Sequence, residues 1–137
     1  MSNALYDSGR QKFLEGSIAW LTDNIKCLLV RGYTPNLATH QTVADVTGAG
    51  GTVVAVTANL GTKTSAAGVA DAADTVFSAV PAGAACQHVA IVKDNGGAQS
   101  TWPLIALIDT ATGLPFTPTG ADENVAWDNG ANKIFKL

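Results

Sequence analysis

Two apolar runs, Cys86-Gln-His-Val-Ala-Ile-Val-Lys93 and Trp102-Pro-Leu-Ile-Ala-Leu-Ile-Asp109, flank the segment Asp94-Asn-Gly-Gly97 and decide the fold class. Each run has the length and apolar content of a buried strand. The asparagine and the glycines between the runs can supply the positive φ values that a hairpin turn needs. We therefore predict an antiparallel pair here, in which Pro103 is tolerated only near the start of its strand or at a sheet edge.

The rest of the chain carries further short strand signals separated by turn residues. Ile25 to Val30 is an apolar run that ends at Arg31-Gly32, and Thr52 to Leu60 is rich in β-branched residues. Strands spaced roughly every 8 to 12 residues predict one β-rich domain over residues 1–137, an antiparallel sandwich or barrel-like domain of about seven or eight strands. Residues 39–46 fit either a helical turn or an edge strand. The expected strands are 25–30, 52–60, about 68–70, 75–80, 86–93, 102–109, 123–127 and 133–137.

The last two expected strands have a common apolar spacing. Val125 and Trp127 are two residues apart, as are Phe135 and Leu137, and Asp128-Asn-Gly-Ala-Asn132 lies between the two strands. Residues two apart share a face of a strand. The sequence therefore predicts a C-terminal hairpin in which the last strand pairs back on the Trp127 strand.

The N-terminal segment from Asn3 to Gly16 has a helical pattern. Its apolar side chains fall near one side, with the last of them at the edge, and Gly16 can adopt the left-handed conformation that ends a helix. Gly9 need not interrupt this helix, although glycine costs about 1 kcal/mol relative to alanine. So short a helix is marginal alone, and we expect its apolar side to dock on the domain or on a neighbouring subunit. The candidate interaction residues are Leu5, Tyr6, Phe13 and Leu14.

The composition favours contacts between proteins. Charged residues make up 14% of the 137 residues, against roughly 25% in typical soluble domains, so much of the surface must be uncharged. The net charge is −3 with a pI near 5.1, and the eight Lys and Arg are scattered, which argues against nucleic-acid binding. The sequence shows neither an apolar stretch of about 20 residues nor a secretory signal, so we expect no membrane association and synthesis in the cytosol.

Residues capable of catalysis or metal binding are dispersed. His40 and His88 stand in no metal or catalytic spacing, and the carboxylates lie on turns and strand ends. Cys27 and Cys86 lie in or beside apolar stretches, where we expect reduced, buried thiols, with a disulfide as the alternative. The aromatic side chains could stack on sugars, but core packing accounts for most of them. We predict no catalytic, cofactor or metal site.

Both ends of the chain carry distinctive segments: Asn3-Ala-Leu-Tyr-Asp-Ser-Gly-Arg-Gln-Lys-Phe-Leu-Glu-Gly16, Trp20 to Lys26, Asp109 to Pro115 and Trp127 to Phe135. These segments resemble a family of small structural proteins of tailed bacteriophages. The resemblance spans the chain but is loose in its Gly- and Ala-rich centre, and it brings no catalytic residues with it.

The resemblance implies a virion component, made in the host cytoplasm, that binds the major capsid protein or other virion proteins. We expect a capsid cement or decoration protein that forms a homo-oligomer, with a trimer favoured by analogy. A tail or fibre component and a carbohydrate-binding module for host attachment remain as alternatives.

Overall fold

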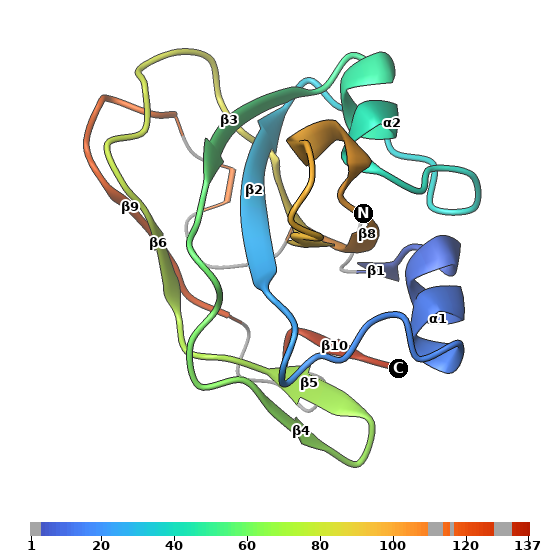
Figure 1. Cartoon of the computed structure of the whole chain (residues 1–137). Coiled ribbons are helices and arrows are strands. Elements are labelled where there is room, and N and C mark those ends of the chain that lie inside the picture. The colour runs from blue at the N-terminus through green and yellow to red at the C-terminus, as the bar shows by residue number, and fades with distance from the viewer. Residues whose placement is uncertain (1–3, 110–113, 116, 128–132) are drawn as a thin grey trace.

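The computed structural model describes residues 4–109, 114–115, 117–127 and 133–137 and has a mainly β architecture (Figure 1). Its largest sheet has five antiparallel strands in the order β1-β8-β7-β2-β3. A three-stranded sheet has the order β10-β5-β4, and β6 pairs with β9 in a two-stranded sheet. The strands are β1 (Ala4–Leu5), β2 (Ile25–Arg31), β3 (Thr52–Val56), β4 (Thr64–Ala66), β5 (Val69–Asp71), β6 (Thr75–Phe77), β7 (His88–Lys93), β8 (Leu104–Ile108), β9 (Glu123–Val125) and β10 (Phe135–Lys136).

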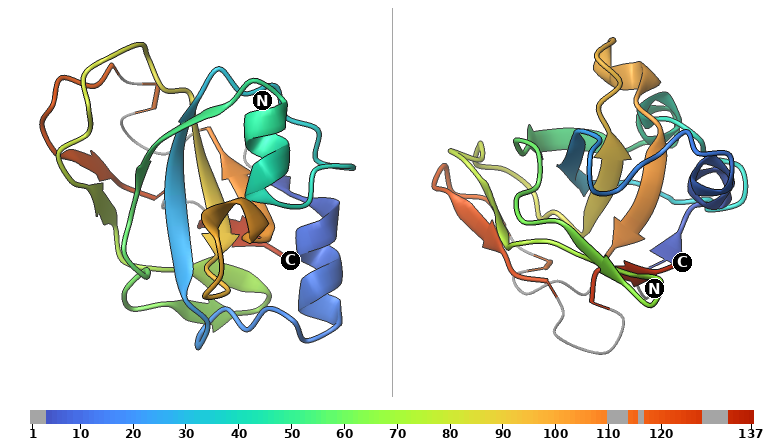
Figure 2. Two further views of the ribbon diagram at one scale, coloured as in Figure 1. Left: turned by 45° about the horizontal axis from the view of Figure 1, so that its top comes forward. Right: turned by 60° about the horizontal axis from the view of Figure 1, so that its bottom comes forward.

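Both faces of the five-stranded sheet are covered, which explains its continuous apolar runs. Successive residues of β2 point to opposite faces, so Cys27 and Leu29 join one buried cluster while Leu28 and Val30 join the other. The first cluster extends to the two smaller sheets. The second is closed by helix α2 (Val43–Gly48) and the segment before it. The two views of Figure 2 show the smaller sheets and α2 on different sides of this central sheet. The arrangement agrees with the predicted mainly β, sandwich-like class.

The hairpin predicted from the two apolar runs is confirmed as β7 and β8, which pair antiparallel. The connection is longer than a tight turn, because a short 3-10 helix, η1 (Gln99–Thr101), follows the positive-φ Gly96. Pro103 precedes the first residue of β8, a position where a missing N–H is tolerated. Its carbonyl accepts a hydrogen bond from the Lys93 amide. The ambiguous segment 39–46 contains the start of α2, and Thr42 bridges to Pro103.

The predicted C-terminal hairpin is wrong. β9 pairs with β6, with Val125 opposite Thr75, and β10 pairs with β5, with Phe135 opposite Ala70. The predicted turn at 128–132 lies outside the described residues. Val125, Trp127 and Phe135 are nevertheless all buried in the first cluster. Leu137, the fourth residue of the predicted pattern, is 55% exposed. The spacing thus predicted burial for three of the four residues, but many strands can satisfy burial, so it did not identify the neighbouring strand.

Several predicted boundaries also shift. The N-terminal helix, α1, spans Asp7–Leu14 only, because Ala4 and Leu5 pair with β8 at the edge of the five-stranded sheet. The expected strand at 75–80 ends at Phe77. Ala79 then has a positive φ, and the next residue, Val80, is buried in the core like Phe77. None of the helices in the described part of the chain combines the length and hydropathy needed to cross a bilayer.

Candidate interaction site

An apolar pocket lies between the N-terminal segment, the β4–β5 hairpin and the C-terminal strand. Its volume is about 180 Å³, and we call it the aromatic pocket. Figure 1 shows α1, β5 and β10, which are far apart in sequence, at the same end of the molecule. The residues that line the pocket are Phe13, Trp20, Ser65, Gly68, Val69, Ala70, Phe135 and Leu137.

Three aromatic rings form the wall of the aromatic pocket. Phe135 lies in the centre, with its ring centroid 5.2 Å from Trp20 in an edge-on arrangement and 5.9 Å from Phe13. Edge-on and tilted pairs at these distances are favourable for aromatic rings. The Trp20 indole N–H donates to the carbonyls of Thr64, at 3.1 Å, and Asp71, at 3.3 Å. These bonds hold the β4–β5 hairpin against the segment that follows α1.

The floor of the aromatic pocket is the β4–β5 hairpin, whose two-residue turn is Ala67-Gly68. Their φ values are 51° and 79°, the conformation of the turn type that matches the twist of a short hairpin. The neighbouring Ser65, Val69 and Ala70 have small side chains, which leaves the pocket open between the aromatic wall and the hairpin.

The four predicted interaction residues do not share one surface. Leu5 is buried in the first cluster and Tyr6 in the second, so both are core residues. Phe13 is half-buried and lines the aromatic pocket. Leu14 follows it and is 85% exposed, so it does not dock on its own domain. The remaining lining residues were missed, because only the folded chain brings them beside Phe13.

A second candidate site is a chain of hydroxyl and imidazole groups around Tyr33. The His40 Nδ1 accepts a bond from the Asn36 amide at 3.2 Å, so the Tyr33 hydroxyl must donate to the same nitrogen, at 2.6 Å. The Tyr6 hydroxyl then donates to Tyr33 at 2.9 Å. The His88 ring meets Tyr33 edge-on, with the centroids 6.2 Å apart. His40 and His88 stand in no metal or catalytic spacing in the sequence, and in the fold both rings pack against Tyr33.

This chain of hydrogen bonds is suited to holding segments together. Burial raises the pKa of both Tyr6 and Tyr33 above the usual range, so both phenols remain neutral hydrogen-bond donors at physiological pH. The bonds join the residue before α1 to the segment between β2 and α2. The geometry supports a structural tie rather than an activated phenolate nucleophile.

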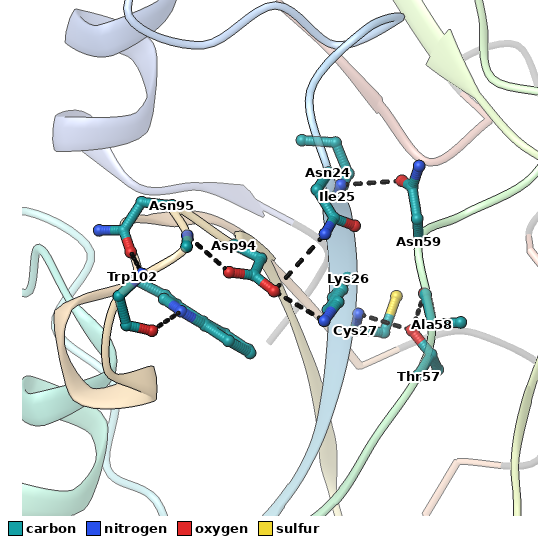
Figure 3. Close-up of polar contacts among 12 residues, drawn as sticks. Asn24, Ile25, Lys26, Cys27, Thr57, Ala58, Asn59, Asp94, Asn95 and Trp102 are labelled. Atoms are coloured by element: carbon teal, nitrogen blue, oxygen red, sulfur yellow. Dashed lines mark hydrogen bonds and ion pairs between the residues drawn. The ribbon is translucent and has the colours of Figure 1, made fainter.

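The charged contacts at one end of β2 also hold segments of the fold together (Figure 3). Lys26 Nζ lies 2.7 Å from Asp94 Oδ2 and 5.1 Å from the centre of the Trp102 ring. The hydrogen bonds from Lys26 and from the Gly96 amide hold the pKa of Asp94 below its usual range. The Trp102 indole donates to the Gly97 carbonyl at 3.1 Å. Together these contacts fasten β2 to the β7–β8 connection.

The two cysteine thiols lie in the core. Cys27 and Cys86 are free and buried, in agreement with the expected buried thiols, and burial raises the pKa of both. A thiol with a raised pKa is a poor nucleophile at neutral pH. Among the described residues, no three His, Cys, Asp or Glu side chains gather as metal ligands would.

The three tryptophans are also committed to the fold. Trp20, Trp102 and Trp127 are each more than nine-tenths buried, and each indole N–H donates to a backbone carbonyl. None presents its ring face to solvent as a sugar-stacking platform would.

Comparison of the chain with protein-family models, with curated proteins and with solved structures found no match.

Proposed function

We propose that this chain is a non-enzymatic structural protein of a tailed-phage particle and acts as a cement or decoration protein on the capsid. The observation that carries the proposal is the aromatic pocket beside exposed Leu14, on a chain with few charged residues. An apolar surface of this kind is typical of a site for binding another protein. The resemblance of the two ends of the chain to small phage structural proteins supports the phage particle as the place where this protein acts.

The polar groups support the same role. The tyrosine and histidine chain, the Lys26–Asp94 pair and the thiols hold segments of the fold together or lie in its core. A cement protein needs a rigid body and an adhesive surface, and this fold offers both. We propose the major capsid protein as its partner, in an assembly in which several copies bind a symmetric lattice with combined avidity.

The test is the copy number of the protein in purified particles, measured by quantitative gel or mass spectrometry. A decoration protein should be present in a fixed ratio to the major capsid protein. A few copies per particle would favour the tail or fibre alternative, and absence from particles would overturn the proposal. The carbohydrate-binding alternative finds no support in the three buried tryptophans.

A further inference from the structure

The three most exposed large apolar side chains of the described residues either line the aromatic pocket or directly follow a residue that does. Leu14 is 85% exposed, Leu137 is 55% exposed and Leu21 is 53% exposed. Leu137 lines the pocket itself, while Leu14 directly follows the lining residue Phe13 and Leu21 directly follows Trp20. Leu137 is therefore an exposed part of the pocket, and each of the other two leucines is one residue away from its wall. Such a surface on a folded domain usually marks a contact with another protein.

The size of the aromatic pocket matches one side chain. A dry apolar cavity of roughly 150 Å³ can hold a benzene molecule. At about 180 Å³, the pocket has room for one leucine side chain. Leu14 is such a side chain, and it is attached to a helix that fixes its direction. The chain thus carries both an open cavity and an exposed side chain of matching size.

The charges beside the two parts are complementary. Glu15 follows Leu14, and the Lys136 side chain lies beside the lining residue Gly68, with its Cγ 3.9 Å from where a Cβ on that glycine would be. Both charged side chains are exposed. No ion pair within the described residues engages either of them. A leucine entering the pocket of another copy would bring an acidic neighbour toward a basic one. This complementarity favours a second copy over an unrelated partner.

We propose that copies of this chain bind one another through Leu14 and the aromatic pocket, with Leu14 of one copy seated in the pocket of another. The inference deepens the proposed structural role by naming the surface through which copies associate. It requires no movement of the core, because Leu14 is already exposed and the pocket is already open. The contact replaces water around two apolar groups at once, which is the main driving force for association.

The experiment is sedimentation of the full chain over a micromolar concentration series, with three variants. Leu14→Asn removes the inserted side chain, and Ser65→Phe fills the pocket from an exposed position on β4. Val76→Asn, at an exposed apolar position on β6, is the matched control. We expect the wild type and the control to associate alike. Each of the other variants should weaken association by about tenfold or more.

A mixture of the Leu14→Asn and Ser65→Phe variants gives the sharpest result. One variant keeps the pocket and the other keeps the leucine, so the mixture should recover association that neither variant shows alone. A wild-type chain that stays monomeric, variants that associate normally, or a mixture that recovers nothing would each overturn the inference. The measurement uses no particles, so its failure leaves the copy number in particles to decide the proposed function.

Discussion

At the scale of single residues, Gly9 shows how tertiary contact reverses a local preference. In an isolated helix, glycine is less favourable than alanine by about 1 kcal/mol. In the fold, a Cβ on Gly9 would lie 2.7 Å from the Ile105 carbonyl oxygen and 3.0 Å from the Ile105 Cα. Helix α1 thus rests directly on the backbone of β8. The sequence alone could not reveal this, because the close approach involves residues almost a hundred positions apart.

The first prediction is that Gly9→Ala destabilises the protein. Overpacking against backbone costs about 1–3 kcal/mol, which outweighs the gain in helix propensity. We expect a net loss of roughly 1–2 kcal/mol in the free energy of unfolding, measured by urea denaturation. Gln11→Ala, at an exposed position of the same helix, should have little effect. Equal stability of Gly9→Ala and wild type would show that α1 does not rest on β8.

The second prediction concerns His88 and pH. Burial holds its pKa below the usual range, against the opposing effect of the Asp109 carboxylate. A histidine with a lowered folded-state pKa contributes stability above its unfolded pKa of about 6.5, and that contribution is lost as the pH falls through the folded value. The free energy of unfolding should therefore decrease on acidification below about pH 6.5. Denaturation series across this range should show a shallower decrease for His88→Asn, and an identical pH dependence would contradict the assignment.

At the scale of elements, the hairpin of β4 and β5 depends on its turn. Ala67 has a left-handed φ of 51°, which is unfavourable for alanine and well tolerated by asparagine. The third prediction is that Ala67→Asn raises the free energy of unfolding by about 0.5–1 kcal/mol, since Asn-Gly is the preferred pair for this turn. Gly68→Ala should lower it by about 1 kcal/mol, because it places a Cβ at a positive φ. Thermal denaturation of both variants would reveal opposite shifts, and shifts of one sign would refute this turn geometry.

The fourth prediction separates two neighbouring residues at the C-terminus. Phe135 is buried against Trp20 and Phe13, whereas Leu137 is largely exposed at the aromatic pocket. Phe135→Ala should lower the free energy of unfolding by about 3–5 kcal/mol, the range for truncating a buried aromatic ring. Leu137→Ala should change it by less than about 1 kcal/mol. Comparable losses from the two substitutions would mean that Leu137 is buried in the core as Phe135 is, which would contradict this placement of the last strand.

The elements also show what local sequence can predict. The β7–β8 pair was predictable because its strands are neighbours in the chain and the connection contains Asp94-Asn-Gly-Gly97. The partners of β9 and β10 were not, because β6 and β5 are roughly 50 to 70 residues away and the same spacing of apolar residues suits any covered strand. Phe13 could be identified as a contact residue from the local helical pattern. Its convergence with Trp20 and Phe135 could not be predicted, because it depends on contacts between distant segments.

At the scale of the whole molecule, the fold combines a tightly packed interior with an exterior that carries few charged side chains. The five-stranded sheet is buried on both faces, and hydrogen bonds or ion pairs fasten its connections. Charged residues are few, and large apolar side chains are exposed, Leu137 at the aromatic pocket and Leu14 next to the lining residue Phe13. Such a surface is a liability for an isolated monomer and an advantage for a protein that works inside an assembly.

A reconstruction of the phage particle in which this chain can be traced would test the proposed capsid role most directly. The proposal predicts that the domain lies on the outer capsid surface, at contacts between neighbouring capsid subunits, with copies repeated across the lattice. The aromatic pocket should be covered there by a protein surface rather than by solvent. Density for the chain in the tail alone, or none in the particle, would contradict the claim that it is a capsid cement protein.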